Sequence, residues 1–139
     1  MKCILACETG WAPFNSRCYK LETSGLADWN TARTACQGLG GNLASVLEQG
    51  VHDLLYSLRG SADFFIGGTD VGSSVTTAGD DSGFTWANGD DWGYKNWWPT
   101  QNQPNHASNQ DCVKVQEDNA FWDDIVCSKL LHYACQKNA

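Results

Sequence analysis

Residues 103–124 read QPNHASNQDCVKVQEDNAFWDD. Side chains that carry oxygen gather there in three groups, at Gln103 with Asn105, at Asp111, and at Asp123 with Asp124. Hard divalent cations take about six to eight oxygen ligands and avoid the nitrogen and thiolate ligands that zinc prefers. The segment therefore predicts a calcium site. An amide that coordinates a metal through its oxygen still donates from its NH2 group, so the same residues can also bind a sugar hydroxyl.

The size and charge of the chain limit what it binds. With 139 residues, 42% of them hydrophobic, it is long enough for one well-buried domain over residues 1–139 and too short for two. The formal net charge of −7 and the isoelectric point of about 4.6 argue against nucleic acid and anionic membranes, because both need a basic face. The sequence has no apolar stretch long enough to span a membrane, so we expect no membrane insertion.

Acidic residues occur as doublets at residues 80–81, 90–91 and 123–124. A doublet of this kind is typical of a solvated turn, and only the third has other ligand-type residues beside it. We therefore interpret the first two doublets as solvent-exposed turns.

Seven cysteines in so short a chain, without a Cys-x-x-Cys motif, indicate disulfides and an oxidising compartment. We therefore expect a secreted protein. The segment from Met1 to Cys7 has too few apolar residues for a signal-peptide core, so we expect any leader to have been removed. Spacing alone does not choose the pairing, and the odd count leaves at least one thiol for an intermolecular bond.

Two helices are predicted in the first half of the chain. The first begins behind Asp28, a predicted N-cap, and ends at the glycines of residues 38–41; its inward positions are Trp29, Ala32 and Cys36. The second follows a capping-box pattern from Ser45 to Glu48 and stops at Gly60. Its apolar stripe consists of Val51, Leu54, Leu55 and Leu58.

The remaining elements are strands around a long irregular segment. Alternation predicts a first strand over residues 17–21 after a loop over residues 12–16, and an apolar run predicts a buried strand over residues 64–67. Further short strands are expected at residues 84–86, 112–115 and 132–135. Residues 69–110 have little periodicity but many tryptophans, which is typical of a functional loop that metal and disulfides order. The result is an α+β domain with its helices first and then a sheet that carries a large loop.

In these motifs the chain resembles the C-type lectin domain, a double-loop fold in which a long loop region holds calcium and sugar. The resemblance covers nearly everything from Cys7 to Gln136. The matching motifs are Cys7-x10-Cys18, Cys36, Phe65-Ile66-Gly67-Gly68, Phe84-x-Trp86, Tyr94-x-Asn96-Trp97, Gln103-Pro104-Asn105, Cys112, Trp122-Asp123-Asp124, Cys127 and Cys135. The resemblance implies an α+β fold with two helices, small antiparallel sheets, a long calcium-binding loop and three intrachain disulfides. The implied pairs are Cys7 with Cys18, Cys36 with Cys135, and Cys112 with Cys127.

The resemblance also implies a ligand set for one calcium ion, which accepts two neighbouring sugar hydroxyls. The implied ligands are Gln103, Asn105, Asp123 and Asp124, with a cis peptide before Pro104. A further acid normally stands two residues before the first cysteine of the loop disulfide, where this chain has Gln110. Asp111 follows in a loop that is one residue shorter, so Asp111 can take this role, and Gln110 is the alternative. We expect a calcium dissociation constant of roughly 10⁻⁴ to 10⁻³ M.

An auxiliary calcium site of the family is mostly missing. It would use Asp70 together with acids at two positions where this chain has Ser74 and His106. We therefore predict one calcium ion. His106 is expected either to contact the sugar or to be an exposed loop histidine.

The sugar motif belongs to neither usual specificity class. Mannose-type members read Glu-Pro-Asn and galactose-type members Gln-Pro-Asp, whereas this chain reads Gln-Pro-Asn and has Trp-Asp-Asp in place of Trp-Asn-Asp. Gln103 and Asp123 together still supply one donor and one acceptor, so the two changes compensate and both sugar classes stay open. Trp98 is a candidate platform for the apolar face of a sugar, and Trp97 is expected to pack in the core.

The sequence lacks the motifs of common enzyme classes. The sequence has no His-Glu-x-x-His, Gly-x-Ser-x-Gly or phosphate loop, so we predict that it is not an enzyme. The alternative is a member of the same fold that binds a protein, ice or a mineral surface without sugar recognition. Cys3 has no partner in the implied pairing, which leaves either a free thiol or a disulfide to a second copy, and linked copies would gain avidity for glycans.

Overall fold

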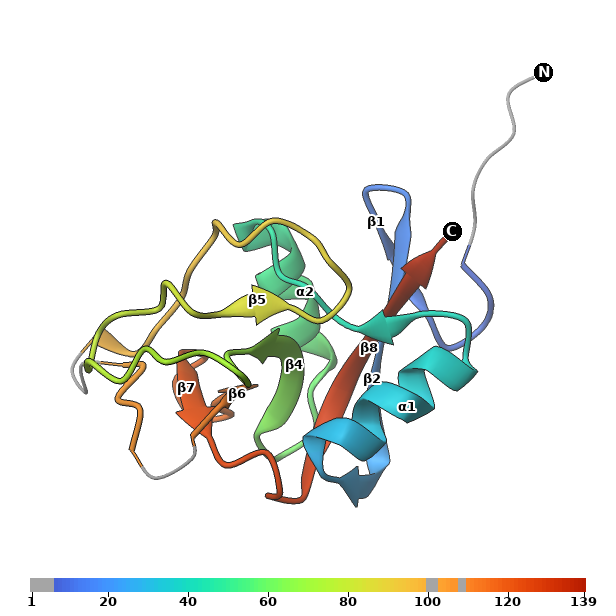
Figure 1. The fold of residues 1–139 in the computed structure, drawn as a ribbon. Coiled ribbons are helices and arrows are strands. Elements are labelled where there is room, and N and C mark those ends of the chain that lie inside the picture. Colours follow the sequence, from blue (N-terminus) through green and yellow to red (C-terminus); the bar gives the residue numbers. More distant parts are fainter. Residues whose placement is uncertain (1–6, 100–102, 108–109) are drawn as a thin grey trace.

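The computed structural model describes residues 7–99, 103–107 and 110–139, which form one eight-stranded sheet and two helices (Figure 1). The fold is α+β, as the sequence predicts. In these ranges, neither helix is long and apolar enough to cross a membrane. The elements in chain order are β1 (Ala12–Phe14), β2 (Arg17–Ala27), α1 (Trp29–Gly38), β3 (Asn42–Leu43), α2 (Gln49–Leu58), β4 (Phe64–Thr69), β5 (Thr85–Trp86), β6 (Cys112–Val115), β7 (Trp122–Ile125) and β8 (Leu131–Asn138).

The sheet joins the early part of the chain to its end. Its strands lie in the order β1-β2-β8-β4-β6-β7, with β3 beside β8 and β5 beside β4. β2 pairs antiparallel with β8, whereas β4 runs parallel to β8. One mixed sheet therefore stands where the resemblance implies small antiparallel sheets, and β2, which contains the strand predicted before the first helix, belongs to it. β1 also occupies residues for which the sequence predicts a loop, where it pairs with β2.

Both helices form, but only one has the predicted cap. Asp28 Oδ1 accepts a hydrogen bond from the backbone N–H of Thr31 at 2.7 Å, which caps α1 as expected. At α2 the N-cap residue is Glu48, and it makes no side-chain cap bond. The capping-box prediction is wrong because Ser45 donates its hydroxyl to Asp90 instead, at 2.6 Å.

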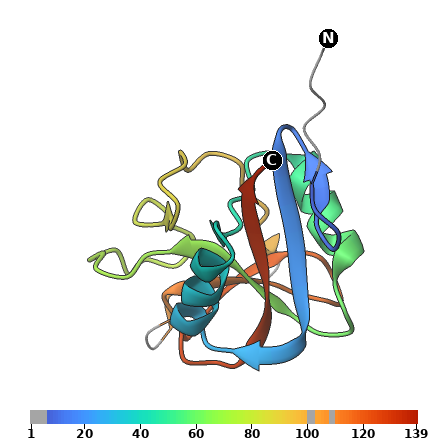
Figure 2. The same ribbon diagram turned by 90° about the vertical axis from the view of Figure 1, so that its right-hand side faces the viewer.

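Two hydrophobic clusters cover the two faces of β4. Side chains alternate along a strand, so Phe64 and Ile66 enter one cluster and Phe65 enters the other. α2 packs into the first cluster and α1 into the second, and Figure 2 shows the helices on opposite sides of the β2–β8 pair. Burial on both faces explains why β4 is a continuous apolar run without a polar alternation.

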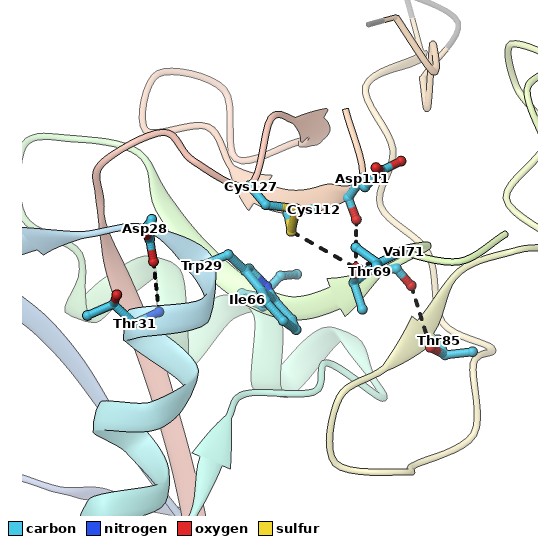
Figure 3. Close-up of a disulfide and its surroundings, with 10 residues drawn as sticks. All are labelled: Asp28, Trp29, Thr31, Ile66, Thr69, Val71, Thr85, Asp111, Cys112 and Cys127. Carbon is cyan, nitrogen blue, oxygen red and sulfur yellow. Dashed lines mark hydrogen bonds between the residues drawn. A yellow bond between two sulfur atoms is a disulfide. The ribbon is translucent and has the colours of Figure 1, made fainter. Parts of the chain in front are cut away.

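Three disulfides have the pairing that the resemblance implies, which is Cys7–Cys18, Cys36–Cys135 and Cys112–Cys127. The second joins α1 to β8 across 99 residues, and the third joins the first residue of β6 to Cys127, just after β7, across 15 residues (Figure 3). Loop-closure entropy makes such bonds worth roughly 3 to 5 kcal/mol each. Cys3 lies outside the described residues, so the bridge to a second copy stays a prediction.

Aromatic packing orders much of the segment between β4 and β6. The rings of Trp86, Trp92 and Trp97 lie 5.6, 5.9 and 5.7 Å from the ring of Trp122 on β7. Asp81 accepts hydrogen bonds from the indole N–H groups of Trp92 and Trp97, at 3.2 and 2.9 Å. The prediction of a solvated turn is wrong for Asp81, because its carboxylate holds two rings of this cluster in place.

Asp90 fixes a second point of the same segment to the sheet. Arg17 of β2 donates to both Asp90 carboxylate oxygens, at 2.7 and 3.2 Å. Ser45 and Asn88 donate to Asp90 Oδ2 at 2.6 and 2.9 Å. The hydrogen bonds from Arg17 hold the pKa of Asp90 down to about 2, against the opposing effect of burial. The prediction of a solvated turn is therefore wrong here as well.

Replacing Asp90 by Asn tests this anchor. A carboxylate with a lowered pKa stabilises the folded state above its unfolded pKa of about 4, and this contribution is lost as the pH falls towards 2. We expect Asp90→Asn to lower the free energy of unfolding at pH 7 by about 1 kcal/mol, after solvent screening is allowed for, and to remove part of the acid sensitivity between pH 4 and pH 2. Urea unfolding across this range measures both effects. The neighbouring exposed Asp91→Asn is the control, and equal behaviour of the two variants would contradict the assignment.

Candidate metal centre

The loop at residues 103–107 forms one side of the candidate site. The peptide bond between Gln103 and Pro104 is cis, as the resemblance implies. Gln103 is buried, and its Oε1 accepts a hydrogen bond from the backbone N–H of Asn105 at 3.0 Å. Asn105 Oδ1 in turn accepts from the backbone N–H of Ala107 at 3.0 Å. The loop's own backbone thus positions both amide oxygens, and each oxygen keeps a second lone pair for a ligand.

Asp124 on β7 faces this loop and is fully buried. Its Oδ1 accepts a hydrogen bond from the backbone N–H of Asn105 at 3.1 Å, and its Oδ2 accepts from that of His106 at 2.8 Å. Burial raises the pKa of Asp124, and these backbone donors oppose the rise. Through this carboxylate, the end of the sheet and the loop at residues 103–107 meet, so Asn105 and Asp124 of the predicted ligand set are in contact.

His106 points into the protein and not towards solvent. Its side chain is 3% exposed, so the interpretation as an exposed loop histidine is wrong. Nδ1 lies 3.2 Å from Asp70 Oδ2, and Nε2 lies 2.7 Å from the carbonyl oxygen of Asp80. The ring therefore joins its own loop to the start of the long segment, and a sugar contact at this residue would have to use its backbone.

Asp111 lies at the Asp70 end of the site. Its carbonyl oxygen accepts a hydrogen bond from Thr69 Oγ1 at 2.8 Å (Figure 3) and another from the backbone N–H of Asp70 at 3.0 Å. The Asp111 carboxylate is also a close neighbour of the Asp70 carboxylate. Burial first, and then this neighbour, raise the pKa of Asp70 to about 6. Asp111 therefore makes its contacts with the segment at residues 69–70, and Gln110 stays the alternative ligand beside the loop at residues 103–107.

Asp123 lies on the other face of β7 from Asp124, as strand alternation requires. Burial raises the pKa of Asp123 to about 6, and Lys114, directly opposite on β6, opposes the rise. Lys114 Nζ is paired with Asp63 Oδ2 at 2.6 Å. No motif in the sequence predicts Lys114 and Asp63 as neighbours of the site. Their closeness depends on the register between β6 and β7, and no sequence motif carries that register.

Three buried oxygens in this region lack a hydrogen-bond partner within the described residues. They are Asp70 Oδ1, Gln110 Oε1 and Asp123 Oδ1. An unpaired buried polar atom costs about 1 to 3 kcal/mol, and a bound ion is one way to satisfy it. In the described ranges no group of three or more His, Cys, Asp or Glu side chains is placed to hold a metal, so amide and backbone oxygens would have to complete a ligand set. This all-oxygen chemistry fits calcium better than zinc.

The two neighbouring tryptophans differ in their roles. Trp97 packs against the larger hydrophobic cluster, with its ring 5.1 Å from that of Phe84, so the core prediction is confirmed. Trp98 is half-buried, and its backbone N–H donates to the carbonyl of Trp122 at 3.0 Å. A sugar platform at Trp98 stays a prediction.

The raised pKa of Asp123 should make the free energy of unfolding of the metal-free protein depend on pH. Because the folded-state pKa of about 6 exceeds the usual value of about 4, ionisation of Asp123 destabilises the fold above pH 6, and this cost disappears as the pH falls from 6 to 4. Asp123→Asn should therefore raise the free energy of unfolding by about 2 kcal/mol at pH 7.5 in chelator, and the gain should vanish near pH 4. Urea unfolding measures it. Asp118→Asn, at an exposed position, is the control, and an Asp123→Asn variant less stable than the parent at pH 7.5 would contradict the assignment.

Comparisons with known proteins agree with one another. The family model of the lectin C-type domain matches residues 25–137. The galactose-specific lectin nattectin of Thalassophryne nattereri is 32% identical, over 96% of this chain and 81% of that protein. The type-2 ice-structuring protein of Hemitripterus americanus is 31% identical, over 87% and 68% respectively. The solved C-type carbohydrate-recognition domain of cow CD23, determined in the presence of GlcNAc2Man3 oligosaccharide, has a TM-score of 0.82 at 28% identity, over 98% of both chains.

Proposed function

Because this chain belongs to the C-type lectin family, we propose that it is a secreted, calcium-dependent carbohydrate-binding domain. The family and its structural neighbours are non-enzymatic binding proteins, and C-type lectin domains generally bind calcium. The observation that carries the proposal is the buried carboxylate of Asp124, which accepts hydrogen bonds from the backbone N–H groups of Asn105 and His106. A buried charge at the meeting point of both ligand motifs is what a cation site needs.

The proposed calcium ligands are those of the two motifs. They are Gln103, Asn105, Asp123 and Asp124, with Asp111 or Gln110 as a fifth. The unpaired buried oxygen of Gln110 supports its inclusion, whereas Asp123, which lies on the other face of β7, is included on its motif alone. When bound, the ion would supply the positive charge that attracts two neighbouring sugar hydroxyls.

The side chains of this set would orient the sugar by hydrogen bonding. Gln103 and Asn105 each commit the amide oxygen to a backbone N–H, so their NH2 groups are the donors for a ligand. Asp123 would accept from the hydroxyl to which Gln103 donates. The ligand is then a galactose- or mannose-type sugar with a vicinal diol. The relatives support both classes, since one is a galactose-specific lectin and another was solved with a mannose-containing oligosaccharide.

Ice or protein binding without sugar is the second candidate. It is favoured by the 31% identity to an ice-structuring protein and by the lack, in the described ranges, of a metal group made from His, Cys, Asp and Glu alone. A thermal-hysteresis measurement with and without chelator separates the two. Ice-growth inhibition together with no retention on immobilised sugars would favour this second function.

Asp124→Asn tests the proposed mechanism. The amide keeps one acceptor for the loop but removes the buried charge, so we expect calcium affinity to fall at least about tenfold, together with loss of retention on galactose- and mannose-agarose. Isothermal calcium titration and the two columns provide the measurements. Asp91→Asn, which changes the net charge equally at an exposed position, should keep both activities. Sugar retention by Asp124→Asn at the parental level would contradict the mechanism.

Calcium binding should weaken in acid. A calcium ligand must be ionised, and the pKa of Asp123 is raised to about 6. Below pH 6 the one proton that calcium displaces from Asp123 should cost about tenfold in affinity per pH unit, so affinity should fall by about tenfold between pH 7.5 and pH 5. Calcium titrations in buffers of different ionisation enthalpy measure the affinity and the protons released. Equal affinity at both pH values, without proton release, would exclude Asp123 as a ligand.

A further inference from the structure

A second polar cleft lies on the opposite side of the fold from the loop at residues 103–107. It has a volume of about 340 Å³ and is formed where β3 and the end of β8 meet the segment that carries Asp90. Figure 1 shows β3 and the carboxyl end of β8 away from β6 and β7. The residues that matter for its chemistry are Arg17, Asn42, Asp90, Gln136 and Asn138. None of them belongs to the proposed calcium site.

Strand register places three carboxamides along one wall of this cleft. Asn42 of β3 is paired with Gln136 of β8, and Asn138 lies two residues further along β8, on the same face as Gln136. Arg17 of β2 is paired with Asn138. The amides therefore form a row across neighbouring strands, and the guanidinium of Arg17 lies at its end.

Hydrogen bonds hold the floor of the cleft in one arrangement. Gln136 Oε1 accepts from the backbone N–H of Ser45 at 2.6 Å. The Ser45 hydroxyl gives its one proton to Asp90 at 2.6 Å, and Arg17 donates two hydrogen bonds to the same carboxylate. Asn42 Oδ1 accepts from the backbone N–H of Leu43 at 2.8 Å. The oxygens of Gln136 and Asn42 are thus committed, and the amide orientation of each is fixed.

The NH2 groups of these amides remain for a ligand. Within the described part of the chain, the NH2 groups of Asn42 and Gln136 and the whole side-chain amide of Asn138 make no hydrogen bond. The charges around them are paired internally, Arg17 with Asp90 and Lys137 with Glu8. A wall with free amide donors and with its charges already paired matches a neutral ligand that carries several hydroxyls, whereas an ionic ligand would have no free counter-charge.

We propose that this cleft is a second, calcium-independent binding site for a neutral polyhydroxylated ligand of the size of one or two sugar rings. The volume is at the lower end of the range for small-molecule sites, about 300 to 1,000 Å³. The wall carries no aromatic platform among its residues, so the affinity of a single sugar is on the order of 1 to 10 mM. A branched glycan that reaches both sites would bind more tightly than a single sugar, because binding at one site raises the effective concentration of its other branch at the second site.

Amide-detected NMR in chelator tests this site apart from the calcium site. The probes are the methyl glycosides of galactose, mannose and N-acetylglucosamine, each titrated to about 100 mM in EDTA. We expect at least one of them to shift the side-chain NH2 signals of Asn42, Gln136 and Asn138 in a saturable way. Asn138→Ala removes an amide that holds no other side chain, and it should weaken this binding at least about fivefold.

Two variants serve as controls. Asn30→Ala removes an exposed amide on α1, and Asp124→Asn acts only at the calcium site, so both should leave the titration in EDTA unchanged. Asn138→Trp should block the cleft, and the backbone spectrum checks its fold. The proposal is overturned if none of the three glycosides shifts these signals, or if Asn138→Ala and Asn30→Ala titrate alike. Because calcium is chelated throughout, either result leaves the proposed calcium mechanism standing.

Discussion

The buried carboxylate of Asp124 is the interaction on which the candidate site depends. A charge with no exposed surface is costly unless donors surround it, and here the backbone N–H groups of Asn105 and His106 supply two bonds. The same bonds attach the loop at residues 103–107 to β7. The two ligand motifs are separated in sequence by 17 residues or more. Without this carboxylate these hydrogen bonds between them would be lost. Its charge also provides a reason for a cation to bind there.

The packed sheet, the disulfides and the tryptophan cluster hold Asp124 and the loop at residues 103–107 in position. β4 is covered on both faces, and Cys36–Cys135 ties α1 to the central strand β8. The irregular segment between β4 and β6 gains its order from packing on Trp122 and from two carboxylates, Asp81 and Asp90, that hold tryptophan rings and a strand arginine. A long loop ordered by its own side chains can present ligand oxygens before any ion arrives, which lowers the entropic cost of binding.

Local patterns in the sequence predict the parts of this structure that local forces determine. The N-cap at Asp28, the buried run of β4 and the bounds of β6 follow from side-chain chemistry and spacing, and the disulfide pairing follows from the resemblance. The predictions from local patterns fail where a side chain bonds to a partner that is distant in the sequence. Ser45, which the local pattern predicts as a helix cap, bonds to Asp90 instead, and His106 turns inward because Asp70 lies in reach. The surroundings of Asp123 depend on strand register, which no motif of a single strand contains.

Calcium-dependent recognition is tested most directly by a glycan array probed with the wild-type protein in calcium, in EDTA, and after calcium is restored. We expect binding to galactose- or mannose-type glycans in calcium, loss of that binding in EDTA, and recovery when calcium returns. Glycan held only in the second cleft, with a millimolar dissociation constant, would dissociate during the washes, so binding there does not obscure the result. Glycan binding that is equally strong in calcium and in EDTA would contradict calcium-dependent recognition by Gln103, Asn105, Asp123 and Asp124.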